Sequence, residues 1–235
     1  MSAPASATVA RRRRVAVIVV VLLVLVTAAW MVSRSPLLDV DHLVVTGNVR
    51  VSTDQVLAAA GVARGDPMVW LDPGSAAHAI EALPWVRTAD VHRDWPGTVT
   101  ITVSERVPVG WVDAGGGSAL VVDRDGRALA IDPFAAAGLP QLLDVTPAPV
   151  GAAITPVGGA WLAGHLSPDE RGVVRSISVV DQSATLVVTS GQEVRFGRLD
   201  QVSDKMRAAI AVLGQPSVAG AAYIDVSAPS TPVAG

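Results

Sequence analysis

The sequence predicts an α+β protein: a single N-terminal transmembrane helix, a β-α-α-β-β domain, and then a mainly antiparallel β domain with a late helix. Three observations predict it. An uncharged apolar run follows four arginines, helical and alternating segments are separated by strong turn signals up to residue 104, and short Val-rich segments dominate afterwards. The expected boundaries are a cytoplasmic tail at 1–14, the transmembrane helix at 15–32, the first domain at 37–104, the second domain at 105–228 and a C-terminal tail at 229–235.

The first element is an apolar run of membrane length. Val15 to Val32 carries no charge, and at ~1.5 Å rise per residue it spans roughly 27 Å, close to the ~30 Å hydrocarbon core. Arg11, Arg12, Arg13 and Arg14 precede it, so the positive-inside rule predicts a cytoplasmic N-terminus and an extracytoplasmic bulk. Residues 1–10 lack an apolar pattern and are expected to be disordered.

A cleaved signal peptide is the alternative for this run. Thr27-Ala28-Ala29 supplies the small residues that such cleavage needs. However, the apolar run continues to Val32 without a polar segment, which favours an uncleaved anchor.

Two short helices are expected in the first domain. Ser52 is placed to cap the first, with Gln55 as its reciprocal partner, and Gly61 is a natural stop. The second is expected to begin after Asp72 and to halt at Pro84.

Three strands accompany these helices. Val99, Ile101 and Val103 alternate with polar residues, the clearest period-2 signal in the chain, and this predicts a strand with one buried face. The expected strands are 40–46, 86–91 and 99–103, with turns at Gly47-Asn48 and at 94–97.

The second domain is expected to consist of short strands at 107–112, 120–123, 127–131, 173–180, 184–190, 193–197 and 222–226. Short helices are expected at 159–166 and after Ser167, and residues 140–156 should be irregular. A longer helix at 199–213 is predicted to bury Val202, Met206, Ala209, Ile210 and Leu213. Pro229 and Pro232 are expected to prevent further strand pairing after residue 226.

Composition and spacing argue against several classes of function. The chain has no cysteine, so it has no disulfide and no thiolate metal site. Four of the 18 basic residues are the arginines at 11–14, so residues 33–235 hold the other 14 basic residues and all 21 acidic residues. This acidic excess argues against nucleic acid as a partner.

No spacing in the chain indicates catalysis. The four histidines, His42, His78, His92 and His165, show no zinc-binding spacing, and no nucleophile-elbow motif occurs, so no cofactor, metal or enzymatic activity is expected. A Ser-His-Asp triad assembled only in space stays an open alternative. Residues 123–126 are predicted to be a hairpin turn with solvated charges and not a calcium loop.

The order of the turn and aromatic markers is more specific than any single motif. Gly47-Asn48, Pro84-Trp85-Val86, Trp95-Pro96 and Glu105-Arg106 resemble the markers of the bacterial FtsQ/DivIB cell division family, in which a POTRA domain precedes a β domain. Leu139-Pro140, Glu193-Val194 and Ile224-Asp225 agree with the second domain of that family.

The resemblance implies a non-enzymatic bitopic scaffold of the divisome at the septum of the plasma (inner) membrane. Such a scaffold links FtsL- and FtsB-type partners and helps to recruit and regulate the septal peptidoglycan synthase. The alternative is a POTRA-containing component of outer-membrane assembly or secretion, which would be expected to carry several POTRA copies.

The same resemblance places FtsB docking on the last predicted strand, at Tyr223, Ile224, Asp225, Val226 and Ser227. Alternation puts Ile224 and Val226 on the core, and an open strand edge can accept another chain. Tyr223 is then the expected anchor, since large aromatic residues are enriched at interface hot spots. The alternative is that Tyr223 packs against the helix predicted at 199–213.

Overall fold

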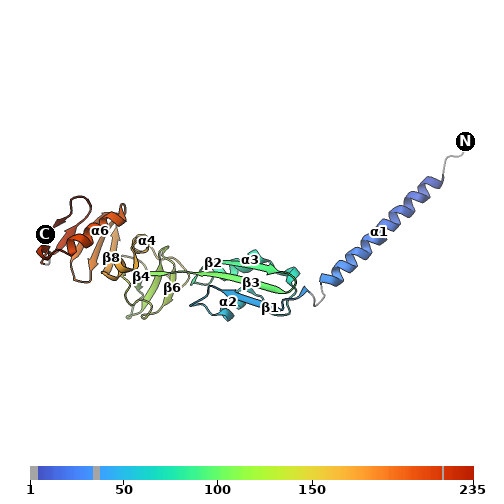
Figure 1. Cartoon of the computed structure of the whole chain (residues 1–235), viewed down its shortest axis with the longest axis horizontal. Helices are drawn as coiled ribbons and strands as arrows, with labels where there is room; N and C mark the ends of the chain where they lie inside the picture. The colour runs from blue at the N-terminus through green and yellow to red at the C-terminus, as the bar shows by residue number, and fades with distance from the viewer. Residues whose placement is uncertain (1–4, 34–37, 219) are drawn as a thin grey trace. The chain divides into compact units, whose positions relative to one another are not determined.

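The computed structural model describes residues 5–33, 38–218 and 220–235 (Figure 1). The chain divides into two compact units. One contains Met1–Glu81 and Val86–Glu105, and the other contains Ala82–Trp85 and Arg106–Gly235. Each unit is described on its own.

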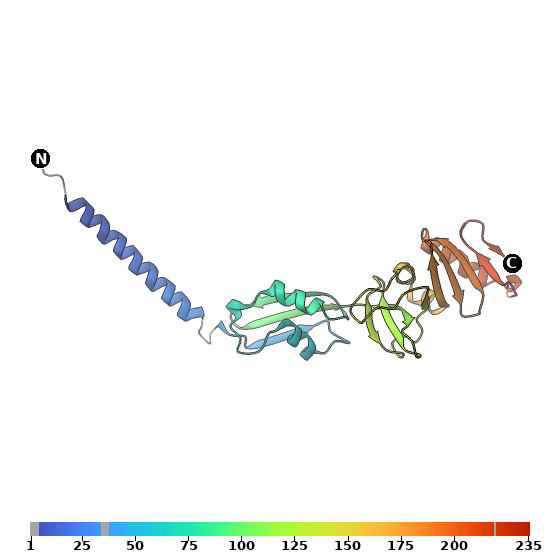
Figure 2. The same ribbon diagram turned by 180° about the vertical axis from the view of Figure 1, so that it is seen from behind.

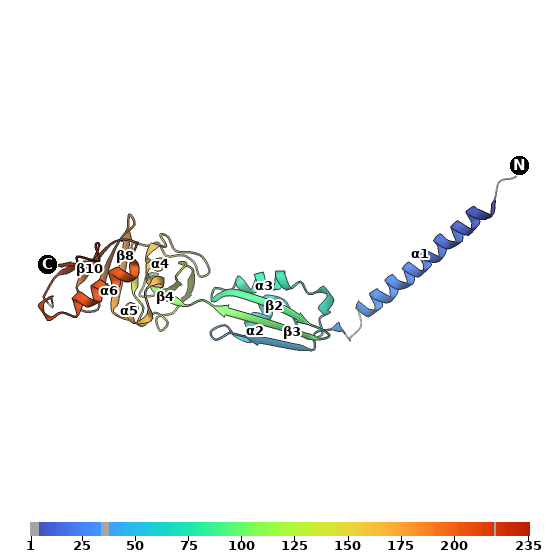
Figure 3. The ribbon, with the colours of Figure 1, turned by 45° about the horizontal axis from the view of Figure 1, so that its top comes forward.

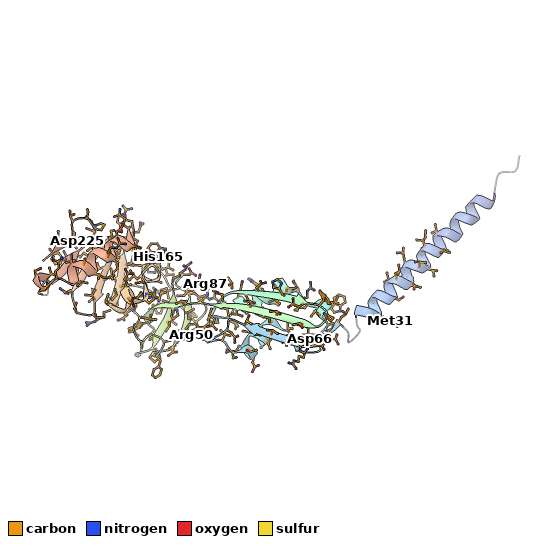
Figure 4. All side chains as sticks on the ribbon, in the orientation of Figure 1. Met31, Arg50, Asp66, Arg87, His165 and Asp225 are labelled. Carbon is orange, nitrogen blue, oxygen red and sulfur yellow. The ribbon has the colours of Figure 1, made fainter. Side chains whose placement is uncertain are left out.

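The first helix, α1 (Ala5–Ser33), contains the apolar run. It begins within the segment that was expected to be disordered, and the reason is local: Ala and Arg are among the best helix formers. The large apolar side chains from Val15 to Val26 are half to two-thirds exposed, and Met31 at its far end is 71% exposed (Figure 4). Across the described part of the chain, no helix combines the length and apolarity that crossing a membrane requires. The transmembrane helix therefore stays a prediction.

The first unit has the predicted β-α-α-β-β order. Its sheet runs β1-β3-β2, with β1 parallel and β2 antiparallel to the central strand (Figure 1). The elements are β1 (His42–Thr46), α2 (Thr53–Ala60), the 3₁₀ turn η2 (Met68–Trp70), α3 (Pro73–Glu81), β2 (Val86–Asp94) and β3 (Thr98–Glu105).

Local sequence signals account for these elements. Ser52 accepts a hydrogen bond from the Gln55 N–H, the Gln55 side chain accepts one from the Ser52 N–H, and Gly61 ends α2 with a φ of 64°. The predicted alternation along β3 is confirmed, because Val99, Ile101 and Val103 are all buried.

A carboxylate at the end of β3 fixes the loop that follows β1. The two Glu105 side-chain oxygens accept hydrogen bonds of 2.7–3.0 Å from the backbone N–H groups of Val49, Arg50 and Val51. In the same loop, Gly47 has a φ of 82°, and a Cβ there would lie 2.0 Å from the Val103 carbonyl oxygen. Only glycine fits at that position.

The second unit is built on a nine-stranded sheet in the order β12-β11-β10-β9-β8-β7-β4-β5-β6. Seen from behind, the later strands lie side by side in the orange and red part of the chain (Figure 2). The strands are β4 (Pro108–Asp113), β5 (Ala119–Asp123), β6 (Ala128–Ile131), β7 (Gln141–Leu143), β8 (Val174–Val180), β9 (Ser183–Val188), β10 (Glu193–Arg198), β11 (Tyr223–Asp225) and β12 (Val233–Ala234).

Helices pack on one face of this sheet (Figure 3). They are α4 (Gly158–His165), α5 (Pro168–Gly172) and α6 (Val202–Leu213), and a short 3₁₀ turn, η3 (Pro216–Val218), follows α6. Leu162 of α4 and Met206 of α6 share one core with Leu142, Ile177 and Phe196 of the strands. At β5 a second cluster of Ala119, Val121 and Ala136 lies apart from this core, so every residue of β5 is buried.

The predictions for the segment 140–156 and for the buried face of α6 were wrong. The segment 140–156 is not wholly irregular, because β7 forms a central strand parallel to both β4 and β8. Three residues are too few to show a period. In α6, Ile210 is 42% exposed although it was expected to be buried, whereas Lys205 is 1% exposed. The Lys205 ammonium donates to Asp200 Oδ1 at 2.6 Å and to the Arg198 carbonyl at 2.8 Å, which satisfies a cation that would otherwise be costly to bury.

The 123–126 turn also differs from the prediction of solvated charges. Asp123 is fully buried, and its Oδ2 lies 2.6 Å from Nη1 of Arg106, whose side chain is 14% exposed. The other Asp123 oxygen accepts the N–H groups of Asp125 and Arg127 at 3.0 and 2.9 Å. This carboxylate therefore holds the hairpin turn together from inside.

Candidate partner-binding edge

The candidate site lies where the sheet of the second unit ends. β11 runs parallel to β10, with Tyr223 opposite Glu193 and Asp225 opposite Arg195. The α6 helix connects the two strands, as a parallel pair requires. The N–H of Val226 also donates to the Arg195 carbonyl at 3.0 Å, so the pairing reaches one residue beyond β11.

β11 is not the edge strand, and this corrects the prediction from Pro229 and Pro232. β12 pairs antiparallel with β11, placing Ala234 opposite Ile224 and Val233 opposite Asp225. The two prolines fall in the connecting loop and leave Val233 to Gly235 free to pair. Gly235 accepts the N–H groups of Ala222 and Tyr223 at 2.7 and 3.0 Å and donates to the Tyr223 carbonyl at 3.1 Å. The edge is therefore β12.

The two faces of β11 have opposite character, as predicted. Ile224 and Val226 are fully buried and belong to the core that contains Met206 and Ala209 of α6. Tyr223 and Asp225 are partly buried and alternate to the other face. Tyr223 therefore faces away from α6, which argues against the alternative in which it packs on that helix.

On this polar face, Tyr223 lies under a cation. The guanidinium carbon of Arg195 is 3.8 Å from the centre of the Tyr223 ring, within the range of a cation–π contact. Arg195 Nε also lies 3.0 Å from Glu193 Oε1. The hydrogen bond to Glu193 raises the pKa of Arg195, so this residue keeps its charge. Glu193, Arg195, Tyr223 and Asp225 thus form one polar face, here called the β10–β11 face.

Asp225 ends the strand by turning the chain. Its Oδ1 accepts the Ser227 hydroxyl at 2.6 Å and the Ser227 N–H at 2.9 Å, which is the pattern of an Asx turn. These bonds, the hydroxyl first, and the Arg195 charge lower the pKa of Asp225. The carboxylate therefore stays ionised over the neutral range.

The predicted site residues are thus divided between strand, core and turn. The structure brings Tyr223 and Asp225 together on the polar face, buries Ile224 and Val226, and places Ser227 in the turn. Arg11, Arg12, Arg13 and Arg14 lie in α1, but their side chains are outside the described residues. Sequence reasoning missed Arg195, Glu193 and Val233. Alternation along 193–197 could have placed the first two on one face, but the parallel register could not be read from the sequence.

The remaining candidate chemistry stays dispersed. All four histidines are exposed, and the His165 ring stacks at 3.9 Å on Trp161. Among the described residues, no three His, Cys, Asp or Glu side chains come together as a metal site would require.

Comparison with known proteins identifies both units. Residues 38–106 match the family described as POTRA domain, FtsQ-type, and residues 110–227 match that described as cell division protein FtsQ/DivIB, C-terminal.

Whole-chain relatives agree with these matches. The chain is 32% identical over 200 residues to a cell division protein FtsQ of Mycobacteroides abscessus, covering 84% of this chain and 62% of the relative. It is 34% identical to that of Mycolicibacterium smegmatis (84% and 57%) and 29% identical to that of Corynebacterium glutamicum (80% and 83%). The match thus spans about three-fifths of the mycobacterial relatives. On these grounds the chain belongs to the FtsQ/DivIB family.

Proposed function

We propose that this chain acts in bacterial cell division as a non-enzymatic scaffold of the divisome. The relatives that match most of the chain carry the name of a division protein, and both domains match in the family's order. The match to the C-terminal domain favours this role over a POTRA component of outer-membrane assembly or secretion. Depleting the protein in its own cells should produce unseptated filaments, and normal septation on full depletion would refute the role.

The proposed scaffold is anchored in the plasma (inner) membrane at the septum, with its N-terminus in the cytoplasm. The arginines at 11–14 before the apolar run support this orientation, and the exposed apolar side chains of α1 support contact with lipid. A reporter enzyme that works only outside the cytoplasm should be active when it is fused after Gly235. A purified protein that begins near Trp30 would contradict the anchor, because it would indicate cleavage.

FtsB- and FtsL-like bitopic proteins are the proposed partners, through which the septal peptidoglycan synthase is recruited and regulated. The observation that carries this proposal is the edge strand β12, whose outer side can receive an added strand. Beside it lies the β10–β11 face, in which Tyr223 supplies a large side chain already positioned by Arg195.

The backbone of β12 offers a direct test of strand addition. Gly235 and Val233 direct their backbone groups to β11, so alternation directs those of Ala234 outward. Ala234→Pro removes the outward N–H and should weaken capture of the FtsB-like partner, whereas Ala234→Val keeps it and serves as the control. Equal affinity of the two folded variants would refute strand addition at β12.

The first domain is proposed to direct the protein to the septum. POTRA folds offer a sheet edge or a groove between helix and sheet that can accept a partner. Deleting residues 37–104 should disperse a fluorescent fusion over the membrane. Unchanged septal localisation would contradict a role of the first domain in recruitment.

A further inference from the structure

We propose that the end of the first unit at which the chain enters from α1 lies on the lipid surface, with the indoles of Trp70 and Trp95 among the headgroups. This inference rests on the proposed membrane anchor. It assigns a membrane-binding surface to a domain that the proposed function uses only for recruitment.

Hydrogen bonds place both tryptophan loops at the entry point. The N–H of Val40 donates to the Asp66 carbonyl at 2.9 Å, and the N–H of Asp41 donates to the Gly97 carbonyl at 2.8 Å. The first contact joins the entering chain to the loop before Trp70, and the second joins it to the turn that contains Trp95. In Figure 4, Asp66 marks this end of the unit, and Arg50 and Arg87 mark the opposite end.

Arg93 connects the two loops to each other. Its Nη1 donates to the Leu71 carbonyl at 3.1 Å, and its guanidinium carbon is 5.8 Å from the centre of the Trp95 ring. The residue after Trp70 and the ring of Trp95 are therefore held by one side chain. Trp70 and Trp95 therefore lie in two loops that Arg93 connects at this end of the domain.

Neither indole is needed to fill the core. Trp70 is 69% exposed and Trp95 is 52% exposed, while Met68, in the same 3₁₀ turn as Trp70, is fully buried. An exposed indole combines a large apolar area with a polar N–H. This combination suits the membrane interface, where one part of the ring can be apolar and the other wet.

The length of the chain argues for lipid as the occupant. Ser33 ends α1, and Leu38 is five residues further on, so the connection spans at most about 18 Å when fully extended. A domain tethered this closely to a membrane helix keeps its entry end near the headgroups, and that end carries the two indoles.

Charge at this end disfavours attraction to anionic lipid as the cause. Asp66, Asp72 and Asp94 are exposed here against the one exposed cation of the same loops, Arg64. Hydrogen bonds from the Ser75 hydroxyl and the Gly74 N–H lower the pKa of Asp72, which keeps it ionised. Arg93 is engaged with the Leu71 carbonyl. Because acidic side chains outnumber basic ones here, the contact is attributed to the indoles, and it should form on zwitterionic lipid.

The experiment uses intrinsic fluorescence of the full chain in phosphatidylcholine vesicles with plain or brominated acyl chains, since bromine quenches tryptophans that reach the lipid. The chain has six tryptophans. If they emit equally and Trp30, Trp70 and Trp95 face lipid, about half of the emission is quenched. Trp70→Phe or Trp95→Phe should lower the quenched share to two of five, about 40%, whereas the control Trp111→Phe in the second unit should raise it to three of five, about 60%.

Trp30→Phe separates this inference from the anchor on which it rests. A lower quenched share for Trp30→Phe, Trp70→Phe and Trp95→Phe alike supports the inference. If only Trp30→Phe lowers the quenched share, while Trp70→Phe and Trp95→Phe raise it as Trp111→Phe does, the anchor is supported and the inference is wrong. If all four variants raise it or leave it unchanged, the anchor itself fails, and the inference fails with it.

Discussion

Removing the cation beside Asp123 should destabilise the second unit strongly. In Arg106→Met, the buried carboxylate loses the guanidinium that lies 2.6 Å away. Breaking a buried ion pair on one side costs about 3–5 kcal/mol. Arg106 is 14% exposed, and Asp123 keeps the N–H groups of Asp125 and Arg127, so the lower end of that range, about 3 kcal/mol, is expected.

Urea unfolding of the full chain in detergent, followed by tryptophan emission, measures this cost. With an m-value of about 2 kcal/mol/M, the midpoint should fall by about 1.5 M. Arg124→Met is the matched control, because Arg124 Nε lies 3.7 Å from Asp125 and both side chains are at least half exposed. Such a surface pair contributes about 0–1 kcal/mol, so its midpoint should move by less than about 0.5 M.

A second substitution tests the cause. If the cost comes from the uncompensated carboxylate, adding Asp123→Asn to Arg106→Met should recover part of the lost stability, since the neutral amide is cheaper to bury. Equal midpoints for Arg106→Met and Arg124→Met, or no recovery in the double variant, would refute the reasoning.

Three other predictions concern the two units. Glu105→Ala should lower the free energy of unfolding of the first unit by about 2 kcal/mol, because the carboxylate loses hydrogen bonds from three backbone N–H groups. Glu81→Ala loses only the hydrogen bond from the Ala89 N–H and should lower it less in the same urea assay. If the proposed FtsB-like partner docks here, Tyr223→Ala should weaken its capture about 30-fold, or about 2 kcal/mol. Tyr223→Phe keeps the ring against Arg195 and should bind nearly normally, and equal titration curves for the two variants would disprove the anchor role. Folding lowers the pKa of Asp225, so the ionised carboxylate stabilises the fold above the unfolded pKa of about 3.9, and this stabilisation is lost as pH falls through the lower, folded pKa. Hydrogen exchange of the β11 amides should therefore become faster at acid pH in the native chain, and Asp225→Asn should not show this pH dependence.

The first unit was largely predictable because its signals are local. The reciprocal bonds of Ser52 and Gln55, the stop at Gly61 and the alternation along β3 each depend on residues a few positions apart. What the sequence did not reveal is the Glu105 carboxylate, which binds N–H groups more than fifty residues away.

In the second unit, the failures are those of short segments and long-range pairs. β7 and β12 have three and two residues, too few to show a period, and their place is set by the strands beside them. The burial of Asp123 and Lys205 depends on Arg106 and Asp200, and spacing alone does not reveal whether a charge is paired in the interior. At the candidate site, alternation correctly assigned the faces of β11, whereas the edge strand was missed.

The strand order of the second unit has a consequence for how its sheet forms when the chain becomes available from its N-terminus onward, as in synthesis. β5 and β6 add outward from β4 on one side, β7 adds on the other, and β8 to β12 follow one after another. Each new strand can therefore pair at once with a strand that has already formed, so an apolar strand remains unpaired, and prone to aggregation, only briefly. In the first unit, by contrast, β1 must wait for β3. The β11–β12 edge forms after β4 to β10, so a partner that requires it would select chains in which those strands have already paired.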